Sequence, residues 1–206
     1  MSAKLIPDIV VGRLPVYLRA LQRMLSEGRR VTSSQELGER LGISAAQIRK
    51  DLSQFGEFGK QGTGYTIEYL AERLKTILHV DGVWDVAVIG AGDIGSALAR
   101  YEGMNNRGFR VAMIFDSDPE KIGTKAGAFT ILDSSDMANV IKEQGIKVAM
   151  LSVPASAAQK IAEVLVDAGI KAILNYAPIN LNVPANVRVQ HIDPVSHLQR
   201  MTYYIE

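Results

Sequence analysis

The sequence predicts an α/β protein made of two folded units and a last helix, with boundaries near residues 80 and 192. Over residues 1–80, apolar residues recur at a spacing of three to four, which is typical of helices packed on a common core. From Trp84 onward, short runs rich in β-branched residues alternate with helical patterns. A chain of 206 residues has room for two small domains, and we expect them at 1–80 and 81–192, followed by a helix within 193–206.

Composition limits the class of protein. Hydrophobic residues make up 47% of the chain and charged residues 22%, as is usual for a soluble globular protein. The N-terminus does not resemble a signal peptide, and no window approaches about 18 apolar residues, so we expect a cytoplasmic protein. The absence of cysteine excludes disulfides, thiolate metal sites and cysteine nucleophiles. His79, His191 and His197 lack the spacing of a helical metal pair, and we expect no metal.

The first unit begins with a helix at Pro15–Glu27. A second helix is predicted over Gln35–Leu41, with its N-cap in the segment 32–34 and Gly42 at its end. A third helix is predicted over Ala45–Phe55, where Ser44 is the N-cap. Two short helices joined by a glycine-containing turn fit helix-turn-helix geometry.

The segment after this helix pair predicts a wing. Residues 56–67 contain four glycines, Lys60 and flanking aromatic residues, a pattern that indicates a β-hairpin with an exposed tip. A hairpin directly after the second helix would make the unit a winged helix, and Glu68–Leu78 would form a further helix. Residues 1–79 hold 12 Lys/Arg against 8 Asp/Glu, whereas the remainder holds 11 against 14. This asymmetry is weak support for an anionic partner, since a solvated surface explains it almost as well.

The second unit alternates strands with helices. The predicted strands are Trp84–Ile89, Phe109–Phe115, Val148–Val153, Lys171–Leu174 and, as a last addition, Val187–Ile192. The predicted helices run from the turn after Ile89 through Tyr101, over Ser135–Gln144, over Ala155–Ala168 and over Pro194–Tyr204. This order predicts a parallel, doubly wound sheet.

A glycine turn connects the first of these strands to its helix: Gly90-Ala91-Gly92-Asp93-Ile94-Gly95. In this pattern Gly90 permits the tight turn, Gly92 lets a pyrophosphate approach the backbone, and Gly95 lets helix and strand pack closely. An acid, Asp116, ends the next strand 26 residues beyond Gly90. Strand, glycine turn, helix and acid together predict a Rossmann-type dinucleotide site; the alternative is a purely structural turn.

Asp116 also bears on the nucleotide. A carboxylate there can accept the ribose hydroxyls but would repel a 2′-phosphate, and no arginine follows within 117–120, so NAD(H) is favoured over NADP(H). The alternative is that Asp116 caps the turn over 116–119.

The candidate DNA-contacting residues lie on the second helix of the pair, at its N-cap and at the wing tip. They are Ser44, Gln47, Arg49, Lys50, Ser53 and Lys60. The first residues of a recognition helix point into the major groove, where Arg or Lys can bond guanine and Gln can bond adenine. A solvated helix face or a protein-docking module is the alternative interpretation.

No catalytic residue emerges. A dehydrogenase needs a proton donor or nucleophile near the nicotinamide, and no acid is placed to orient a histidine. The chain also has no room for a substrate domain, so we expect no enzyme. A small NAD-dependent dehydrogenase with an appended helix-turn-helix module, and a module for CoA or ATP, remain the alternatives.

Taken together, the motifs resemble those of the Rex family of redox-sensing transcriptional repressors over nearly the whole chain. They are Tyr17-Leu18-Arg19, Arg49-Lys50-Asp51-Leu52-Ser53 with Phe55-Gly56, Gly59 to Tyr65, Gly90 to Gly95 with Ala97-Leu98 and Tyr101, Phe115-Asp116-Ser117-Asp118-Pro119, Val153-Pro154 with Ala158-Gln159, and Asn175-Tyr176-Ala177-Pro178. The resemblance implies a homodimer that senses the NADH/NAD⁺ ratio. It further implies that NADH releases the protein from a palindromic operator, whereas NAD⁺ competes without causing release.

The resemblance also implies roles for single residues. Arg49 and Lys50 would read bases, and Lys60 would lie in a minor-groove wing. Arg19, Tyr101 and Asp193 would form a switch that responds to the nicotinamide. Asn175, Tyr176, Ala177 and Pro178 would line the nicotinamide pocket, and Val153 and Pro154 would also bind the cofactor. The last helix would be exchanged between protomers. The chain departs from the family pattern at Pro194 and Gln61, which puts nicotinamide packing and minor-groove affinity in question.

Overall fold

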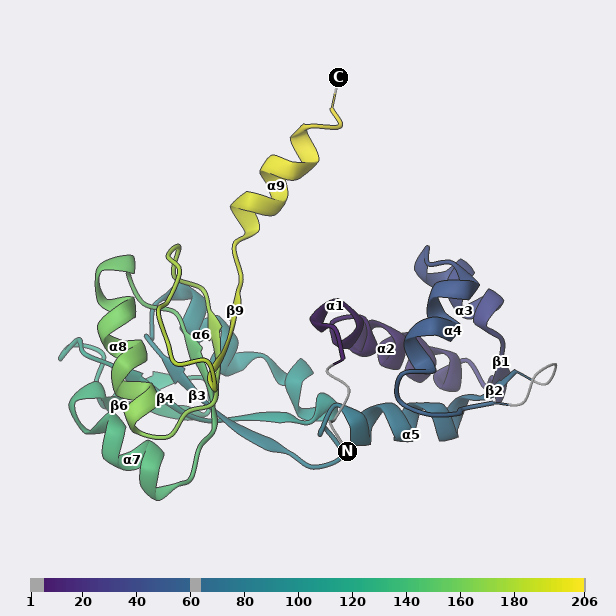
Figure 1. The fold of residues 1–206 in the computed structure, drawn as a ribbon. Helices are drawn as coiled ribbons and strands as arrows, with labels where there is room; N and C mark the ends of the chain where they lie inside the picture. Colours follow the sequence, from purple (N-terminus) through teal and green to yellow (C-terminus); the bar gives the residue numbers. More distant parts are fainter. Residues whose placement is uncertain (1–5, 60–63, 206) are drawn as a thin grey trace. The chain divides into compact units, whose positions relative to one another are not determined.

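The computed structural model describes residues 6–59 and 64–205, and the chain divides into two compact units that meet in sequence at Gly82 and Val83 (Figure 1). Each unit has its own buried apolar clusters, and each is described by itself. Within the described residues, no helix is long and apolar enough to cross a membrane.

The first unit is a helical bundle with a small sheet. Its elements are α1 (Asp8–Val11), α2 (Leu14–Ser26), β1 (Val31–Thr32), α3 (Ser34–Leu41), α4 (Ala45–Leu52), β2 (Tyr65–Thr66) and α5 (Ile67–Ile77). The core is formed by the inner faces of four helices, with Leu21, Leu37, Ile48 and Leu70 fully buried. Ser33 and Ser44 accept hydrogen bonds from N–H groups in the first turns of α3 and α4. The predicted starts of both helices are therefore confirmed.

Helix α4 ends at Leu52, and the predicted end at Phe55 is wrong. The N–H groups of Gln54 and Phe55 bond carbonyls three residues back, on Asp51 and Leu52, at 3.2 and 2.9 Å. These shorter-range bonds tighten the chain into a turn, as is common where a helix finishes. Phe55 still packs against the core, which is why its apolar character extended the helical pattern.

The predicted hairpin of the wing is described only at its two ends, because its tip, residues 60–63, lies outside the described residues. Gly59 and Gly64 lie side by side, since a Cβ on Gly59 would collide with the carbonyl oxygen of Gly64, and Tyr65 and Thr66 form a strand that pairs with Val31–Thr32. The N–H of Ile67 continues this ladder by donating to the carbonyl of Arg30 at 3.0 Å. Two-residue strands carry no detectable alternation, so the sequence could not reveal this pairing. Lys60 and Gln61 lie outside the described residues.

The second unit contains a seven-stranded sheet in the order β5-β6-β4-β3-β7-β8-β9. The strands are β3 (Trp84–Ile89), β4 (Phe109–Asp116), β5 (Lys125–Ala126), β6 (Phe129–Asp133), β7 (Val148–Leu151), β8 (Ala172–Asn175) and β9 (Arg188–His191). All neighbouring pairs are parallel except β5 with β6. The five predicted strands are present with small shifts at their ends, whereas β5 and β6 were missed.

Helices cover both faces of this sheet. They are α6 (Asp93–Arg100), α7 (Met137–Glu143) and α8 (Ala155–Asp167), with short 3₁₀ helices at Glu102–Arg107 and Ser134–Asp136. Along β3 the buried residues alternate between two clusters: Ala87 and Ile89 pack with α7 and α8, and Val86 and Val88 pack with α6. Burial on both faces explains why this strand is apolar almost throughout.

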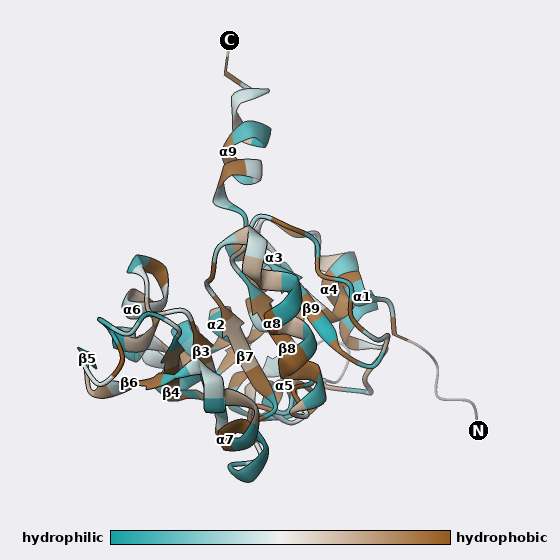
Figure 2. Ribbon diagram, turned by 90° about the vertical axis from the view of Figure 1, so that its left-hand side faces the viewer, coloured by the Kyte–Doolittle hydropathy of each residue, from teal (hydrophilic) through white to brown (hydrophobic). Residues whose placement is uncertain are grey.

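Helix α9 (Pro194–Thr202) follows β9 and contains no buried residue. Its side chains Val195, Leu198 and Met201 recur at a helical spacing and are 58–62% exposed. Figures 1 and 2 show this helix projecting from the rest of the second unit, with hydrophobic residues along it. A helix with such an apolar face is unusual on a free surface.

Candidate functional site

The carboxyl ends of β3, β4, β7 and β8 lie at one edge of the sheet, because these strands are parallel neighbours. The order of the sheet reverses between β3 and β7. In open α/β sheets the crevice at such a point is where ligands bind. The glycine turn follows β3 directly and therefore lies at this crevice.

The three glycines of the turn have different surroundings. Gly90 has a φ of 97°, and its N–H donates to the carbonyl of Phe115 at 2.8 Å. A Cβ on Gly95 would collide with the carbonyl oxygen of Gly90 and lie 2.7 Å from Ser152 Oγ, so α6 packs tightly on the strand ends. A Cβ on Gly92 would meet nothing within 4 Å. The backbone is thus open to a ligand at Gly92, where α6 begins.

The start of α6 offers N–H groups to an anion. Gly92 is the N-cap, and the first N–H groups of a helix have no partner within it. Asp93 and Ile94 are exposed in this first turn. The geometry is that of a phosphate cradle, with an acidic and an apolar side chain beside it.

Asp116, at the end of β4, connects to the glycine turn. Its Oδ2 accepts a hydrogen bond from the N–H of Ala91 at 2.7 Å, and its Oδ1 accepts one from the N–H of Asp118 at 2.9 Å. The second bond is the turn cap that the sequence left as an alternative. An ionised carboxylate accepts about four hydrogen bonds, so this cap leaves capacity for ribose hydroxyls.

A cation that the sequence search missed lies beside this carboxylate. Lys121 Nζ is 3.5 Å from Asp116 Oδ2, just beyond the segment 117–120 in which an arginine was sought. Burial works against ionisation of Asp116, but the N–H groups of Asp118 and Ala91 and the Lys121 ammonium hold the pKa of the carboxyl below its usual value. Asp116 is therefore ionised at neutral pH.

Ser152, which was not among the predicted site residues, holds the end of β7 against the glycine turn. Its N–H bonds the carbonyl of Ile89 at 2.8 Å, and its hydroxyl lies 3.1 and 3.0 Å from the carbonyl oxygens of Ile89 and Gly90. Val153 follows, and its Cγ1 lies close to Gly90. Pro154 is exposed next to it. Val153, one of the predicted cofactor-binding residues, therefore lies beside the glycine turn, and Pro154 follows it in sequence.

Asn175 ends β8 and is fully buried. Its Oδ1 accepts from the N–H of Ala177 at 2.9 Å, and its Nδ2 lies 3.1 and 2.9 Å from the carbonyl oxygens of Ala177 and Ile179 and 3.1 Å from His191 Nδ1. This amide is engaged within the chain, so Asn175 shapes the loop rather than presenting its side chain. Burial raises the pKa of Tyr176, while Ala177 is buried and Pro178 exposed on the same loop.

The three predicted switch residues lie on three elements. Tyr101 follows α6 and is half-exposed, with its ring against Gly103. Asp193 is the N-cap of α9, and its Oδ1 accepts from the N–H of Val195 at 3.0 Å. Arg19 belongs to α2 in the first unit, so an association of the three is not part of either unit alone.

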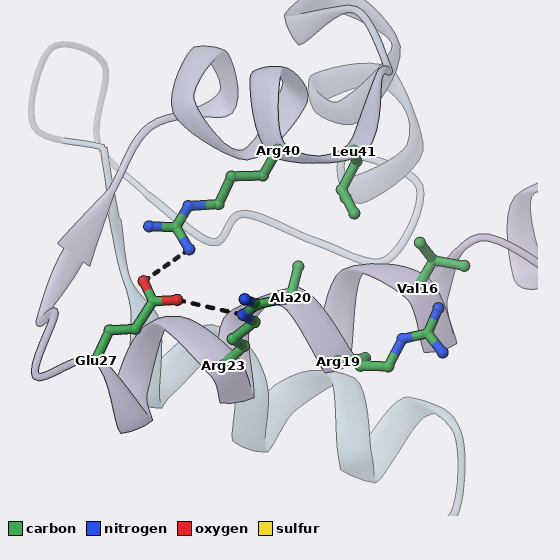
Figure 3. A pocket seen from close by; sticks show the side chains of 7 residues that line it. All are labelled: Val16, Arg19, Ala20, Arg23, Glu27, Arg40 and Leu41. Atoms are coloured by element: carbon green, nitrogen blue, oxygen red, sulfur yellow. Dashed lines mark ion pairs between the residues drawn. The ribbon is translucent and has the colours of Figure 1, made fainter.

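Arg19 lines a groove of about 410 Å³ between α2 and α3 (Figure 3). Glu27 crosses the groove by pairing with Arg40 at 2.7 Å and with Arg23 at 3.4 Å. Val16 lies beside Arg19 at the other end of the groove. The groove is lined by three arginines and one carboxylate, which leaves it with an excess of positive charge.

On α4, the helix predicted to contact DNA, the candidate side chains differ in whether other groups of the chain already bind them. Ser44 caps the helix, Arg49 and Lys50 are exposed, and Ser53 Oγ donates to the carbonyl of Lys50 at 2.9 Å. Arg49 Nη1 donates to Ser34 Oγ of α3 at 2.9 Å. The sequence treated Gln47 as free to read a base, but its Nε2 donates to Asp51 Oδ1 at 2.7 Å.

Comparisons with known proteins agree with both halves of this description. Residues 5–53 match the model of a family described as "Putative DNA-binding protein N-terminus", and residues 81–179 match the family "CoA binding domain". A redox-sensing transcriptional repressor Rex of Chloroflexus aurantiacus is 54% identical over 199 residues, which is 97% of this chain and 94% of that protein. The chain belongs to the Rex family. The resemblance inferred from its motifs is thereby confirmed.

Rex proteins from other organisms and solved structures extend this finding. Rex 1 of Thermotoga maritima is 47% identical over 204 residues, covering 98% of this chain and 97% of that one. The crystal structure of RSP in complex with β-NAD⁺ and operator DNA has a TM-score of 0.92 at 38% identity, covering 97% of this chain and 92% of that one. The crystal structure of RSP in complex with β-NADH has a TM-score of 0.88 at 36% identity, and the match covers 97% of this chain and 94% of the RSP chain. The predicted fold, a winged helix-turn-helix followed by a Rossmann-like domain, is confirmed at the level of the family.

Proposed function

We propose that this Rex protein is a homodimeric repressor that binds a palindromic operator and leaves it when NADH binds. The observation that carries the proposal is the likeness, over nearly the whole chain, to RSP, whose structures are described with β-NAD⁺ and operator DNA and with β-NADH. The open backbone at Gly92, at the point where the sheet order reverses, supports dinucleotide binding by this chain itself.

The dinucleotide would lie along the carboxyl edge of the sheet. Its pyrophosphate would contact the N–H groups after Gly92, and its adenosine ribose would bond Asp116. The nicotinamide would lie toward β7 and β8, against Val153, Pro154 and the loop 176–178. Asn175 would act by holding that loop. The cofactor supplies the redox signal, and the chain's own residues bind and orient it.

We propose binding without turnover. Tyr176 is the titratable side chain on the nicotinamide loop, and burial raises its pKa, so it stays protonated at neutral pH and is a poor base. Among the described residues, no group of three metal-ligating side chains comes together. The relatives are named as repressors rather than enzymes. We also propose that the protein acts in the cytoplasm and uses no metal.

The DNA-binding domain would comprise residues 1–80, the dinucleotide domain 81–192 and the dimerisation helix 193–206. Arg49 and Lys50 would contact base edges in the major groove, and Ser44 and Ser53 would contact the neighbouring phosphate backbone of the DNA. Lys60 would reach the minor groove from the wing. The apolar face of α9 would be covered by the partner protomer through an exchange of helices. Arg19, Tyr101 and Asp193 would then change partners between the two states of the dimer.

Coupling between the two sites follows a population shift. NADH would bind better to a dimer whose recognition helices lack the half-site spacing of the operator. A coupling free energy of about 1–3 kcal/mol corresponds to roughly a 5–150-fold change in operator affinity.

The test is a fluorescence-anisotropy titration with a palindromic duplex that the protein itself selects from a randomised pool. NADH should release the duplex at concentrations where NAD⁺ does not, and added NAD⁺ should oppose the release. If both dinucleotides act alike, the sensor proposal fails. Competition by CoA for the NADH site would favour the alternative of a CoA-binding module, which the family description "CoA binding domain" names. Sustained NADH oxidation with a simple aldehyde or keto acid would favour a dehydrogenase.

A further inference from the structure

Asp51 is a fully buried carboxylate on the recognition helix α4. It accepts four hydrogen bonds: from Arg13 Nε at 2.6 Å, Arg13 Nη2 at 2.7 Å, Tyr17 Oη at 2.6 Å and Gln47 Nε2 at 2.7 Å. All four groups belong to the first unit. Asp51 belongs to the sequence motif Arg49-Lys50-Asp51-Leu52-Ser53 but is not itself a candidate for contact with DNA.

The network is complete. Each carboxylate oxygen accepts two hydrogen bonds, and Arg13 forms a bidentate ion pair with the carboxylate, which is the strong geometry for such pairs. Burial works against ionisation of Asp51, but the bonds from Arg13, Tyr17 and Gln47 outweigh it and hold the pKa of the carboxyl below its usual value. Burial and the neighbouring carboxylate raise the pKa of Tyr17 to about 12, so its hydroxyl remains a donor.

The donors come from two directions. Arg13 is the N-cap of α2 and Tyr17 lies in its first turns, while Gln47 lies one turn before Asp51 on α4 itself. The carboxylate therefore joins the start of α2 to the inner side of α4. It lies next in sequence to the exposed residues Arg49 and Lys50. Apolar contacts of Ile48 and Leu52 resist separation of the helices, but hydrogen bonds of fixed direction also resist rotation of α4 about its axis.

The same network holds the Gln47 side chain. An amide can bond adenine through its two groups only if both point outward. Here Nε2 donates inward to Asp51 at 2.7 Å, and Gln47 is only partly exposed. Freeing this amide would take a donor from a buried charge, which is costly.

We propose that Asp51 is a positioning residue for DNA reading: it sets the orientation of α4 on α2 and keeps Gln47 turned toward the protein, so that Arg49 and Lys50 carry the base contacts of this helix. The inference rests on the proposed function, because it concerns how the operator is read. It differs from a purely stabilising role, since a buried ion pair contributes little stability compared with well-packed apolar residues.

The experiment measures affinities for the selected duplex, for duplexes with single base-pair changes through one half-site, and for a non-palindromic duplex, all without dinucleotide. Asp51→Asn should weaken the selected duplex at least tenfold more than the non-palindromic one, and should alter the order of preference among the changed duplexes. Glu39→Gln, an exposed acid on α3 of the same unit, controls for the loss of one negative charge and should retain the wild-type order.

Two further variants separate positioning from folding. Tyr17→Phe removes one donor but keeps the ion pair, and should reduce selectivity for the chosen duplex by a smaller factor with no loss of NADH binding. Gln47→Ala likewise removes one donor and should reduce selectivity by a similarly small factor spread over the whole half-site, whereas loss of preference at one base pair only would show that Gln47 reads that base. That selective loss would overturn the inference.

The inference would also be overturned if Asp51→Asn and Tyr17→Phe bound all duplexes with the wild-type order of preference, because the network would then be structural only. Failure of the unsubstituted protein to bind any duplex would overturn the proposed function, and this inference with it. Binding by the unsubstituted protein with unaltered selectivity in the variants would overturn the inference alone.

Discussion

Two substitutions three residues apart in the glycine turn should both weaken NADH binding but differ in their effect on stability. In Gly95→Ala, the added methyl would lie 2.7 Å from Ser152 Oγ and 2.9 Å from the carbonyl carbon of Gly90, and closer still to the oxygen of that carbonyl. The backbone of Gly90 cannot turn away, because its N–H is bonded to Phe115 in the sheet. Overpacking of this kind costs about 1–3 kcal/mol. We expect a loss of about 2 kcal/mol of stability in the second unit and, from the usual entropy of unfolding, a fall in Tm of roughly 10 °C.

Gly92→Ala is the matched control. Its φ of −75° suits alanine, and the added methyl meets nothing within 4 Å of the chain. Losing a glycine N-cap costs only about 0.5 kcal/mol, so Tm should change by only a few degrees. The methyl would, however, stand where a pyrophosphate must approach the backbone. We expect NADH affinity to fall at least tenfold, or about 1.4 kcal/mol.

Thermal unfolding followed by circular dichroism and NADH titration followed by fluorescence separate the two effects. The reasoning predicts low stability with weakened binding for Gly95→Ala, and near-normal stability with weakened binding for Gly92→Ala. Wild-type NADH affinity in Gly92→Ala would refute the placement of the phosphates. An unchanged Tm in Gly95→Ala would refute the close packing of α6 on the strand ends.

Three other predictions concern charged or titrating groups. The pKa of Asp116 is lower in the folded protein than in the unfolded chain. Its contribution to stability is therefore complete above the usual carboxyl pKa and is lost as the pH falls through the folded-state pKa. The free energy of unfolding in urea should depend less on pH between pH 6 and 3 in Asp116→Asn than in the wild type. Lys121 offsets the charge of Asp116, so Lys121→Ala should raise the ratio of NADH to NADPH affinity severalfold in competition titrations, and a lowered ratio would contradict this role. The pKa of Tyr17 is raised to about 12 from 10.0, so its contribution of about 2–3 kcal/mol is present below pH 10 and is lost as pH rises toward 12. The unfolding free energy should therefore fall between pH 9 and 11.5 in the wild type and much less in Tyr17→Phe.

The elements that could be predicted from sequence are those whose burial repeats along the chain. β3 was placed with its observed bounds because its last four residues are buried on both faces, which produces an uninterrupted apolar run. β6 was missed because Ile131 is its one buried residue, so the strand shows no alternation. The pairing of β1 with β2 depends on residues about 34 apart, and no local pattern records it.

In the candidate site, too, the features that depend on local spacing were predicted from the sequence. The glycine turn and Asp116 follow from local spacing, and both lie at the expected edge of the sheet. Lys121 lies five residues after Asp116, one position beyond the segment in which a cation was sought, whereas Ser152 acts on a turn 62 residues earlier, which local spacing does not encode. The direction of a side chain is likewise set by its partners. Gln47 bonds Asp51 one helical turn on, and Asn175 bonds Ala177 two residues on and lies 3.1 Å from His191 Nδ1; sequence spacing places these groups near one another but does not show that the amides turn inward.

Helix α9 has a consequence for how the protein responds to its own concentration. A helix of nine residues is marginal in water when nothing packs against it, even with the Asp193 cap and Pro194 in its first turn. Its order must therefore come from whatever covers Val195, Leu198 and Met201. If a second copy does so, folding of the tail and association are one event, and dilution would melt this segment while leaving the first unit and the sheet of the second unit folded. The amount of protein in the cell would then set how many chains are competent to respond.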